Sequence, residues 1–229
     1  MTTMRTYGDG CAIAQALDLV GERWALLVVR ELLLGPKRYT DLRRGLPNAS
    51  PNVLSQRLAE LERAGIIRRR KLPPPAGARV YELTEWGHGL QETVTSLGQW
   101  AARSPSPPST APIRSADSII LALRARFDAR AAHGLRARYE LRLGEDRFRV
   151  DVADDELETA REEADRPDAT IESDADTIAA VLWGGRPLGD ARSSGAMTIE
   201  GDEAAVERFV GMFPMPAAAA ATAGGHLRS

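Results

Sequence analysis

The stretch SPNVLSQRLAELERAGIIRRR, from Ser50 to Arg70, decides the fold of the first half of the chain. Ser50 is a favourable N-cap residue, and Pro51 suits the first position of a helix. Gly65 is a typical residue at a helix end. A leucine stripe recurs at helical spacing, made of Leu54, Leu58 and Leu61. We therefore expect a helix with one buried face, followed by a strand that contains three consecutive arginines.

The side of this helix opposite the leucines is polar, short and nearly uncharged in its first turns. A helix face that is merely solvated would more often be rich in Glu and Lys. Asn52 and Gln56 are of the types that pair with adenine edges, and Ser55 is adaptable, so this face suits a DNA major groove. We expect it to read bases, with Arg63 placed to contact phosphate or guanine.

Basic residues lie on both sides of this helix in the sequence and on its flank. Phosphate contacts supply affinity through counterion release, and base-edge contacts supply specificity. The open alternative for the arginine run is a solvated strand end. The predicted DNA-binding residues are Arg43, Arg44, Ser50, Asn52, Ser55, Gln56, Arg57, Arg63, Arg68, Arg69, Arg70 and Arg79.

The elements around this helix follow the order of a winged helix-turn-helix. Helices are expected over residues 11–21, 23–35 and 38–46, and strands over residues 66–72 and 79–84. Between the strands, PPPAGA is too rigid and too polar for a core and should form a protruding loop. A last helix is expected over 85–101, where apolar residues recur at helical spacing: Leu90, Val94, Leu97 and Trp100 or Ala101.

Charge divides the 229-residue chain, whose formal net charge is −2. Residues 1–103 hold 15 basic and 10 acidic side chains, a net +5, whereas residues 104–229 hold 15 and 22, a net −7. Nucleic acid would attract the first part and repel the second. We expect a DNA-binding and dimerisation domain at 1–103, a Pro/Ser-rich linker at 104–116, a second domain at 117–214 and a mobile Ala-rich tail at 215–229.

Three motifs within about residues 9–103 resemble the HxlR family of bacterial transcriptional regulators: CAIAQALDLVGERWALLVVRELLLGPKRYTDL, LSQRLAELERAGIIRR and VYELTEWGHGL. The resemblance implies a winged helix-turn-helix that binds double-stranded DNA at a pseudo-palindromic operator. It also implies a homodimer, usually built from the first and last helices of this half. The proline-rich loop departs from the family pattern and leaves the path of the wing open.

The second half alternates between predicted helices and strands. An amphipathic helix over 116–132 precedes a hairpin over 135–152, and a third strand lies near 157–161. Further strands are expected at 168–174 and 195–202, and helices at 175–185 and 203–213. RPDATIESDADTIAAVLWGG and GAMTIEGDEAAVERFVGMF resemble the sterol-carrier-like (SCP2-like) fold, over about residues 117–213. This resemblance implies helices over a small, mostly antiparallel sheet, which makes the complete chain an α+β protein.

The SCP2-like resemblance also implies an apolar cavity that holds a lipid or another hydrophobic small molecule. Met and aromatic side chains adapt to varied apolar ligands. A filled core would have the same composition, so pocket and core stay open as alternatives. The candidate lining residues are Phe127, Leu182, Trp183, Met197, Phe209, Met212 and Phe213.

Cys11 is the only cysteine, which excludes an intramolecular disulfide and fits a cytoplasmic location. It lies near a helix start, where a thiolate is stabilised, so it is either a redox sensor or a small buried residue at a dimer contact. His88, His133 and His226 show no metal-ligand spacing. We also find no nucleophile–base arrangement, no secretory signal and no run long enough to span a bilayer. We expect no metal, no cofactor and no catalysis.

These observations lead to one main hypothesis and one alternative. The hypothesis is a dimeric, sequence-specific transcriptional regulator whose acidic half either senses a hydrophobic small molecule or strengthens dimerisation. The alternative is a carrier of lipids or other hydrophobic ligands whose first half serves dimerisation. The sequence does not reveal the operator, the ligand, or whether the protein represses or activates.

Overall fold

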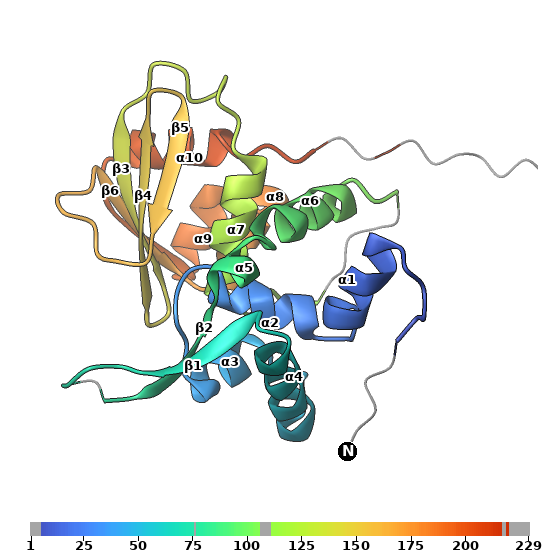
Figure 1. The fold of residues 1–229 in the computed structure, drawn as a ribbon. Coiled ribbons are helices and arrows are strands. Elements are labelled where there is room, and N and C mark those ends of the chain that lie inside the picture. Colours follow the sequence, from blue (N-terminus) through green and yellow to red (C-terminus); the bar gives the residue numbers. More distant parts are fainter. Residues whose placement is uncertain (1–5, 76, 106–110, 217–218, 220–229) are drawn as a thin grey trace, which may run out of the picture.

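The computed structural model describes residues 6–75, 77–105, 111–216 and 219 (Figure 1). Buried apolar residues form two separate hydrophobic clusters, one between Val20 and Leu83 and the other between Ile119 and Phe213. Much of the predicted linker and most of the predicted tail, 106–110, 217–218 and 220–229, lie outside the described residues. Among the described helices, none is long and apolar enough to cross a membrane.

The first cluster belongs to a helix-turn-helix with a wing. The central helix α2 is buried along most of its length, as its nearly continuous apolar sequence predicts. Leu42 and the stripe Leu54, Leu58 and Leu61 pack against it from the two following helices. The elements are α1 (Ala12–Val20), α2 (Ala25–Leu32), α3 (Tyr39–Gly45), α4 (Pro51–Arg63), β1 (Ile67–Lys71) and β2 (Arg79–Leu83).

The single helix expected over 85–101 is divided into α5 (Glu85–His88) and α6 (Gln91–Ala102), so that prediction is wrong in this respect. Gly87 and Gly89 have low helix propensity, which weakens the helix at this point. Gly87 also lies so close to the residue before β1 that a Cβ atom there would clash with the carbonyl oxygen of Ile66. Thr84 caps α5 by accepting a hydrogen bond from the Gly87 amide at 3.0 Å.

The second cluster lies between helices and a five-stranded sheet with the strand order β5-β4-β3-β6-β7. Strands β3 and β6 pair in parallel and the other neighbours are antiparallel, so the expected mostly antiparallel sheet is confirmed. The strands are β3 (Ala137–Leu143), β4 (Asp146–Ala153), β5 (Glu156–Ala160), β6 (Ala169–Ser173) and β7 (Met197–Gly201). The helices are α7 (Ala116–Arg126), α8 (Ala175–Trp183), α9 (Leu188–Ser193) and α10 (Glu203–Gly211).

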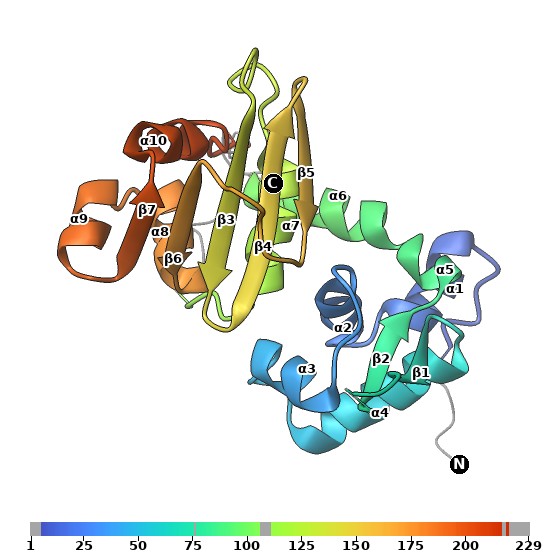
Figure 2. The same cartoon turned by 90° about the vertical axis from the view of Figure 1, so that its left-hand side faces the viewer.

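The helices cover one face of this sheet, and the other face is open (Figure 2). Alternate residues of β3 and β4 point into the core, as the sequence alternation predicts: Tyr139, Leu141, Leu143, Phe148, Val150 and Val152 are buried. The open face carries ion pairs, such as that between Arg138 and Asp151 at 2.7 Å. The short helix α9 was not expected from the sequence, because its six residues show no apolar periodicity.

The two halves touch through helices. Helix α6 lies beside α7, and the Gln99 side chain donates a hydrogen bond to the Ala125 carbonyl at 3.0 Å (Figure 1). Apolar side chains cross the boundary in both directions, since Leu34 packs against the second cluster and Leu121 against the first. The acidic half is therefore attached to α2 and α6 rather than only tethered to them.

Candidate nucleic-acid interface

Helix α4 presents its polar face to solvent because its other face is fully used by the core. Ser50 caps the helix by accepting a hydrogen bond from the Val53 amide at 3.4 Å, and Pro51 occupies the first turn. With the leucine stripe buried, the opposite residues project outward. The exposed residues of the predicted set on and beside α4 are Ser50, Asn52, Ser55, Gln56 and Arg63. The acidic half does not cover them.

Local hydrogen bonds orient this polar face. The Ser55 hydroxyl donates to the Tyr39 oxygen at 3.3 Å, and the Tyr39 hydroxyl donates to the Pro51 carbonyl at 3.1 Å. Gln56 donates to Glu60 at 2.9 Å, one turn further along α4. Tyr39 was not singled out from the sequence. Its position at the start of α3 could have indicated this contact with α4. In a helix-turn-helix, the helix before the recognition helix packs across it.

Arg57 is a correction to the predicted set. Its side chain is only 9% exposed, and it forms ion pairs with Glu60 on the same helix and with Glu22 just before α2. The prediction placed it on the flank of α4 within reach of DNA. Helical spacing locates the flank, but it does not show that the loop before α2 packs against it. In this structure Arg57 holds α4 to the rest of the domain.

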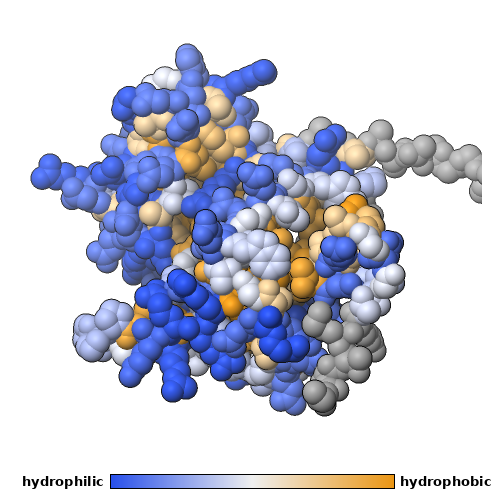
Figure 3. Space-filling model, in the orientation of Figure 1, coloured by the Kyte–Doolittle hydropathy of each residue, from blue (hydrophilic) through white to orange (hydrophobic). Residues whose placement is uncertain are grey.

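The wing carries the arginine run as expected. In the antiparallel pair β1–β2, Arg68 lies opposite Glu82, Arg69 opposite Tyr81 and Lys71 opposite Arg79. All four basic residues of β1 are exposed, whereas Ile67 is buried. The side chains form a blue surface over the wing at the lower left in Figure 3. The loop expected to protrude has exposed prolines at 73–75, and residue 76 lies outside the described residues.

Acidic side chains hold several wing arginines in place. Glu82 accepts hydrogen bonds from Arg68 at 2.7 Å and from Arg70 at 2.8 Å. Desolvation raises the pKa of Glu82, but these two guanidinium groups outweigh it and hold the pKa below its usual value. Arg69 pairs with Glu62 at 3.0 Å and lies over the Tyr81 ring. The carboxylate of Glu82 therefore stays charged and keeps two arginines side by side.

Arg43 and Arg44 lie at the end of α3, next to α4, and both are exposed. Arg44 forms an ion pair with Glu145 at 2.8 Å, across the boundary between the halves. Glu145 lies at the tip of the β3–β4 hairpin. Among the residues that the structure describes, Arg43, Arg63 and Arg79 form no ion pair. The cationic surface around α4 thus combines paired and unpaired arginines.

A second exposed surface is apolar. Helix α6 has no buried residue, and its Trp100 is 75% exposed. On α1, Ile13 is 71% exposed, and hydrophobic patches lie over this helix in Figure 3. Exposed apolar patches of this kind typically mark sites of contact with another molecule. Cys11 also lies here, at the exposed N-cap of α1, where the Ile13 and Ala14 amides lower the pKa of its thiol.

The seven residues predicted to line an apolar pocket come together in the second half. Six of them, all but Met197, come from helices or from the segments that follow them. Phe209 and Phe213 lie with ring centroids 4.9 Å apart, and Phe127 lies 6.1 Å from Phe213. Five of the set are less than a tenth exposed: Leu182, Met197, Phe209, Met212 and Phe213. These side chains pack against one another as a core does, and a ligand pocket among them stays a prediction.

The part of the chain that the structure describes contains no group of three His, Cys, Asp or Glu side chains that could hold a metal ion. His88 is the last residue of α5, and His133 pairs with Asp155 at 3.0 Å on the surface of the second half. His226 lies outside the described residues.

Two family models match the chain in succession. Residues 19–107 match HxlR-like helix-turn-helix, and residues 114–219 match the alkyl sulfatase C-terminal family. The second match agrees with the SCP2-like fold of helices over a mixed sheet. In the solved structures, a double mutant of the sec-alkyl sulfatase PisA1 is 17% identical with a TM-score of 0.41, covering 43% of this chain and 16% of the sulfatase.

The first half is similar to several curated regulators, two of them from Bacillus subtilis. The HTH-type transcriptional regulator YvaP is 37% identical over 87 residues, which are 38% of this chain and 81% of YvaP. The HTH-type transcriptional regulator YodB is 36% identical over 95 residues, 42% of this chain and 85% of YodB. The structure of reduced YodB has a TM-score of 0.39 and 34% identity, covering 43% of this chain and 98% of YodB. Because the chain matches this family's model and covers most of YvaP and YodB, it belongs to the HxlR-like helix-turn-helix family of DNA-binding transcriptional regulators.

Proposed function

We propose that this regulator is sequence-specific, with α4 in the major groove and the wing along the adjacent backbone. The observation that carries the proposal is the exposed face of Asn52, Ser55 and Gln56, which neither half of the chain covers. Amide side chains can pair with base edges, and the surrounding arginines can contact phosphates. Arg57 is left out of the proposed contacts, because it is buried and paired.

The proposed active form is a homodimer. Its support is the apolar surface of α1 and α6, including Ile13, Leu17, Leu97 and Trp100, which a single chain leaves exposed. A two-fold dimer would place two copies of α4 on one side of the duplex, so the operator would be an inverted repeat. Cys11 lies beside this surface, and its redox role stays a prediction.

The proposed division of labour follows the proposed domain boundaries. Residues 1–103 bind DNA and dimerise, residues 104–116 connect, and residues 117–214 respond to a hydrophobic small molecule or add to the dimer contact. The two separate hydrophobic clusters support this division. The carrier alternative has less support, because the side chains predicted to hold its cargo pack against one another.

Selection from a random duplex library with the full chain tests the proposal. The enriched sequences should contain an inverted repeat with half-sites about one helical turn, 10–10.5 base pairs, or a multiple of it apart. Binding to the enriched duplex should weaken steeply with salt, since phosphate contacts release counterions. Recovery of unselected sequences after repeated rounds, with equal affinity for all of them, would contradict sequence-specific recognition.

A further inference from the structure

A cavity lies where the two halves of the chain meet. It is bordered by α2, by the turn between α3 and α4, and by the segment that leads into α7. Its volume is about 410 Å³, within the range of about 300–1,000 Å³ that is usual for small-molecule sites. None of the seven residues that the sequence suggested for a pocket borders it. The position is notable because the turn between α3 and α4 ends at Ser50, the N-cap of the helix proposed to read DNA.

The lining of this cavity combines apolar walls with positive charge. Trp24, Leu27 and Ile113 contribute apolar surface, and the charged side chains among the described residues of the lining are Arg30 and Arg114. No acidic residue is among the part of the lining that the structure describes, so the two arginines give it a positive charge. A ligand that suits this lining has an apolar body and a negative group.

The backbone of Trp24, which borders the cavity, is strained. Its φ is 79°, in the left-handed region that a bulky residue rarely adopts. The guanidinium of Arg23 lies 5.2 Å from the centre of its ring, on which it stacks. Residues held in such conformations are concentrated at ligand clamps and switch regions. Here the strained residue lies directly before α2 and borders the cavity.

We propose that this cavity binds a small amphipathic organic anion, with its carboxylate or sulfate between Arg30 and Arg114, and that its occupancy changes DNA binding. This inference deepens the proposed function and rests on it for the regulatory part. It places the ligand at the junction of the halves rather than in the core beneath the sheet.

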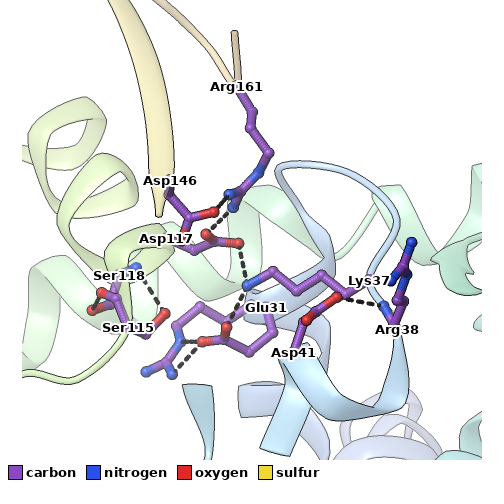
Figure 4. A network of polar contacts seen from close by, with 10 residues as sticks. Glu31, Lys37, Arg38, Asp41, Ser115, Asp117, Ser118, Asp146 and Arg161 are labelled. Atoms are coloured by element: carbon purple, nitrogen blue, oxygen red, sulfur yellow. Dashed lines mark hydrogen bonds and ion pairs between the residues drawn. The ribbon is translucent and has the colours of Figure 1, made fainter. Parts of the chain in front are cut away.

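A network of charged side chains runs from Glu31 through Lys37 to Asp117 (Figure 4). Arg30, which borders the cavity, pairs with Glu31 and so belongs to it. Arg30 donates to Glu31 at 2.7 Å through Nη2 and at 3.2 Å through Nε, and neither bond uses the two N–H groups of Nη1. Glu31 also accepts from Lys37 at 2.6 Å, and Lys37 pairs with Asp117 of α7 at 2.8 Å. A ligand anion that binds Arg30 shares its guanidinium with Glu31 and so perturbs this network.

The same lysine is attached to the wing by its backbone. The Lys37 amide donates to the Tyr81 carbonyl at 3.0 Å, and the Tyr81 amide donates to the Lys37 carbonyl at 2.8 Å. Beyond Asp117, the network continues to Arg161 and Asp146 at the edge of the sheet. A shift of Lys37 therefore moves β2 at its middle residue, and a shift of the turn before Ser50 moves the start of α4.

Calorimetric titration of the full chain with decanoate and with decyl sulfate, both below their micelle concentrations, tests the site. Decanol and a decyl ammonium salt serve as neutral and cationic probes. The decisive variant is Arg114→Glu, because Arg114 is exposed and forms no ion pair with any residue that the structure describes, so its loss does not threaten the fold. Arg130→Glu is the matched control, an exposed arginine with the same charge change beyond the far end of α7.

The anionic probes should bind the wild type and Arg130→Glu alike, and Arg114→Glu at least about tenfold more weakly. The cationic probe should not bind at this site. Decanoate should also change the affinity of the wild type for its selected operator several-fold, and leave that of Arg114→Glu unchanged.

Equal binding of decanoate by Arg114→Glu and the wild type, or equal binding of the cationic probe, would overturn the site. A chain that binds its operator but neither anion would overturn this inference and leave the proposed function standing. A chain that binds decanoate through Arg114 but no DNA would uphold the site and overturn the proposed function.

Discussion

Arg57 and Arg63 lie on the same helix, yet their surroundings suit different roles, Arg57 in stabilising the fold and Arg63 in contacting DNA. Arg57 is buried and pairs with Glu60 and Glu22, whereas Arg63 is exposed and forms no ion pair among the described residues. Replacing each by Met, which keeps an unbranched side chain, should separate these roles.

Arg57→Met should lower the free energy of unfolding by about 1–3 kcal/mol, because charged hydrogen bonds in a buried site are lost. Arg63→Met should change stability by less than about 0.5 kcal/mol and reduce the salt slope of DNA binding by about 1. Urea unfolding and fluorescence anisotropy measure the two effects. A stable Arg57→Met chain with weakened DNA binding would mean that Arg57 turns outward to the duplex.

The outward amides of α4 could be predicted from the sequence, because helical spacing assigns each side chain to a face. The role of Arg57 could not be predicted from the sequence. Its partner Glu22 lies in a loop that only the tertiary fold brings close to α4. The same reason applies to Trp24, since a left-handed backbone at a tryptophan leaves no trace in an apolar pattern.

The β3–β4 hairpin reaches α3 through a single ion pair between Glu145 and Arg44, both largely exposed. If Arg44 contacts a phosphate in the complex, Glu145 competes for it. Glu145→Gln should then strengthen DNA binding about two- to fivefold at low salt, the range of an exposed ion pair. Glu163 is another exposed glutamate of the same half, and Glu163→Gln should leave the DNA affinity unchanged. Equal affinities of the three proteins would show that the hairpin lies away from the bound duplex.

Helix α6 gives a prediction about assembly. Trp100→Glu places a charge on the exposed apolar surface, so sedimentation should show single chains where the wild type shows dimers. The affinity of the variant for the inverted repeat should also fall, because a separate chain then binds each half-site. Since no residue of α6 is buried, the fold should tolerate the change. A variant that still sediments as a dimer would place the interface elsewhere.

Element types were predictable where apolar periodicity is strong, as in α4 and in the β3–β4 hairpin. The boundary between α5 and α6 was not predictable from periodicity, because it depends on the close approach of Gly87 to the Ile66 carbonyl. The parallel pairing of β3 with β6 could not be predicted either. Alternation of apolar and polar residues shows which face of a strand is buried, but not which strands are neighbours.

The charge network between the halves should give the complete chain a pH-dependent stability. Burial alone would raise the pKa of Glu31, but Lys37 and Arg30 outweigh it and hold the pKa below its usual value. Burial raises the pKa of Asp117 above its usual value, against the opposing influence of Lys37 and Arg161. The contribution of Glu31 to stability is thus present above its unfolded-state pKa and lost as the pH falls through the folded pKa. For Asp117 the contribution is present at lower pH and lost as the pH rises through its folded pKa.

Glu31→Gln should therefore lower stability by about 3 kcal/mol at neutral pH, because Lys37 and Arg30 lose a buried partner. The deficit should shrink as the pH falls below about 4.3, the pKa of an unfolded glutamate. Urea unfolding across this range measures it, with the exposed Glu207→Gln as control. A deficit that stays constant with pH would show that Glu31 stabilises the junction by packing alone.

The most direct measurement of the central claim is the affinity of Gln56→Ala for the selected operator and for a scrambled duplex at one salt concentration. If the outward face of α4 reads bases, operator binding weakens by about 1–3 kcal/mol while scrambled binding is unchanged. Gln91→Ala, an exposed glutamine at the start of α6, should match the wild type on both duplexes. Unchanged affinity of Gln56→Ala for both duplexes would contradict the assignment of α4 as the recognition helix.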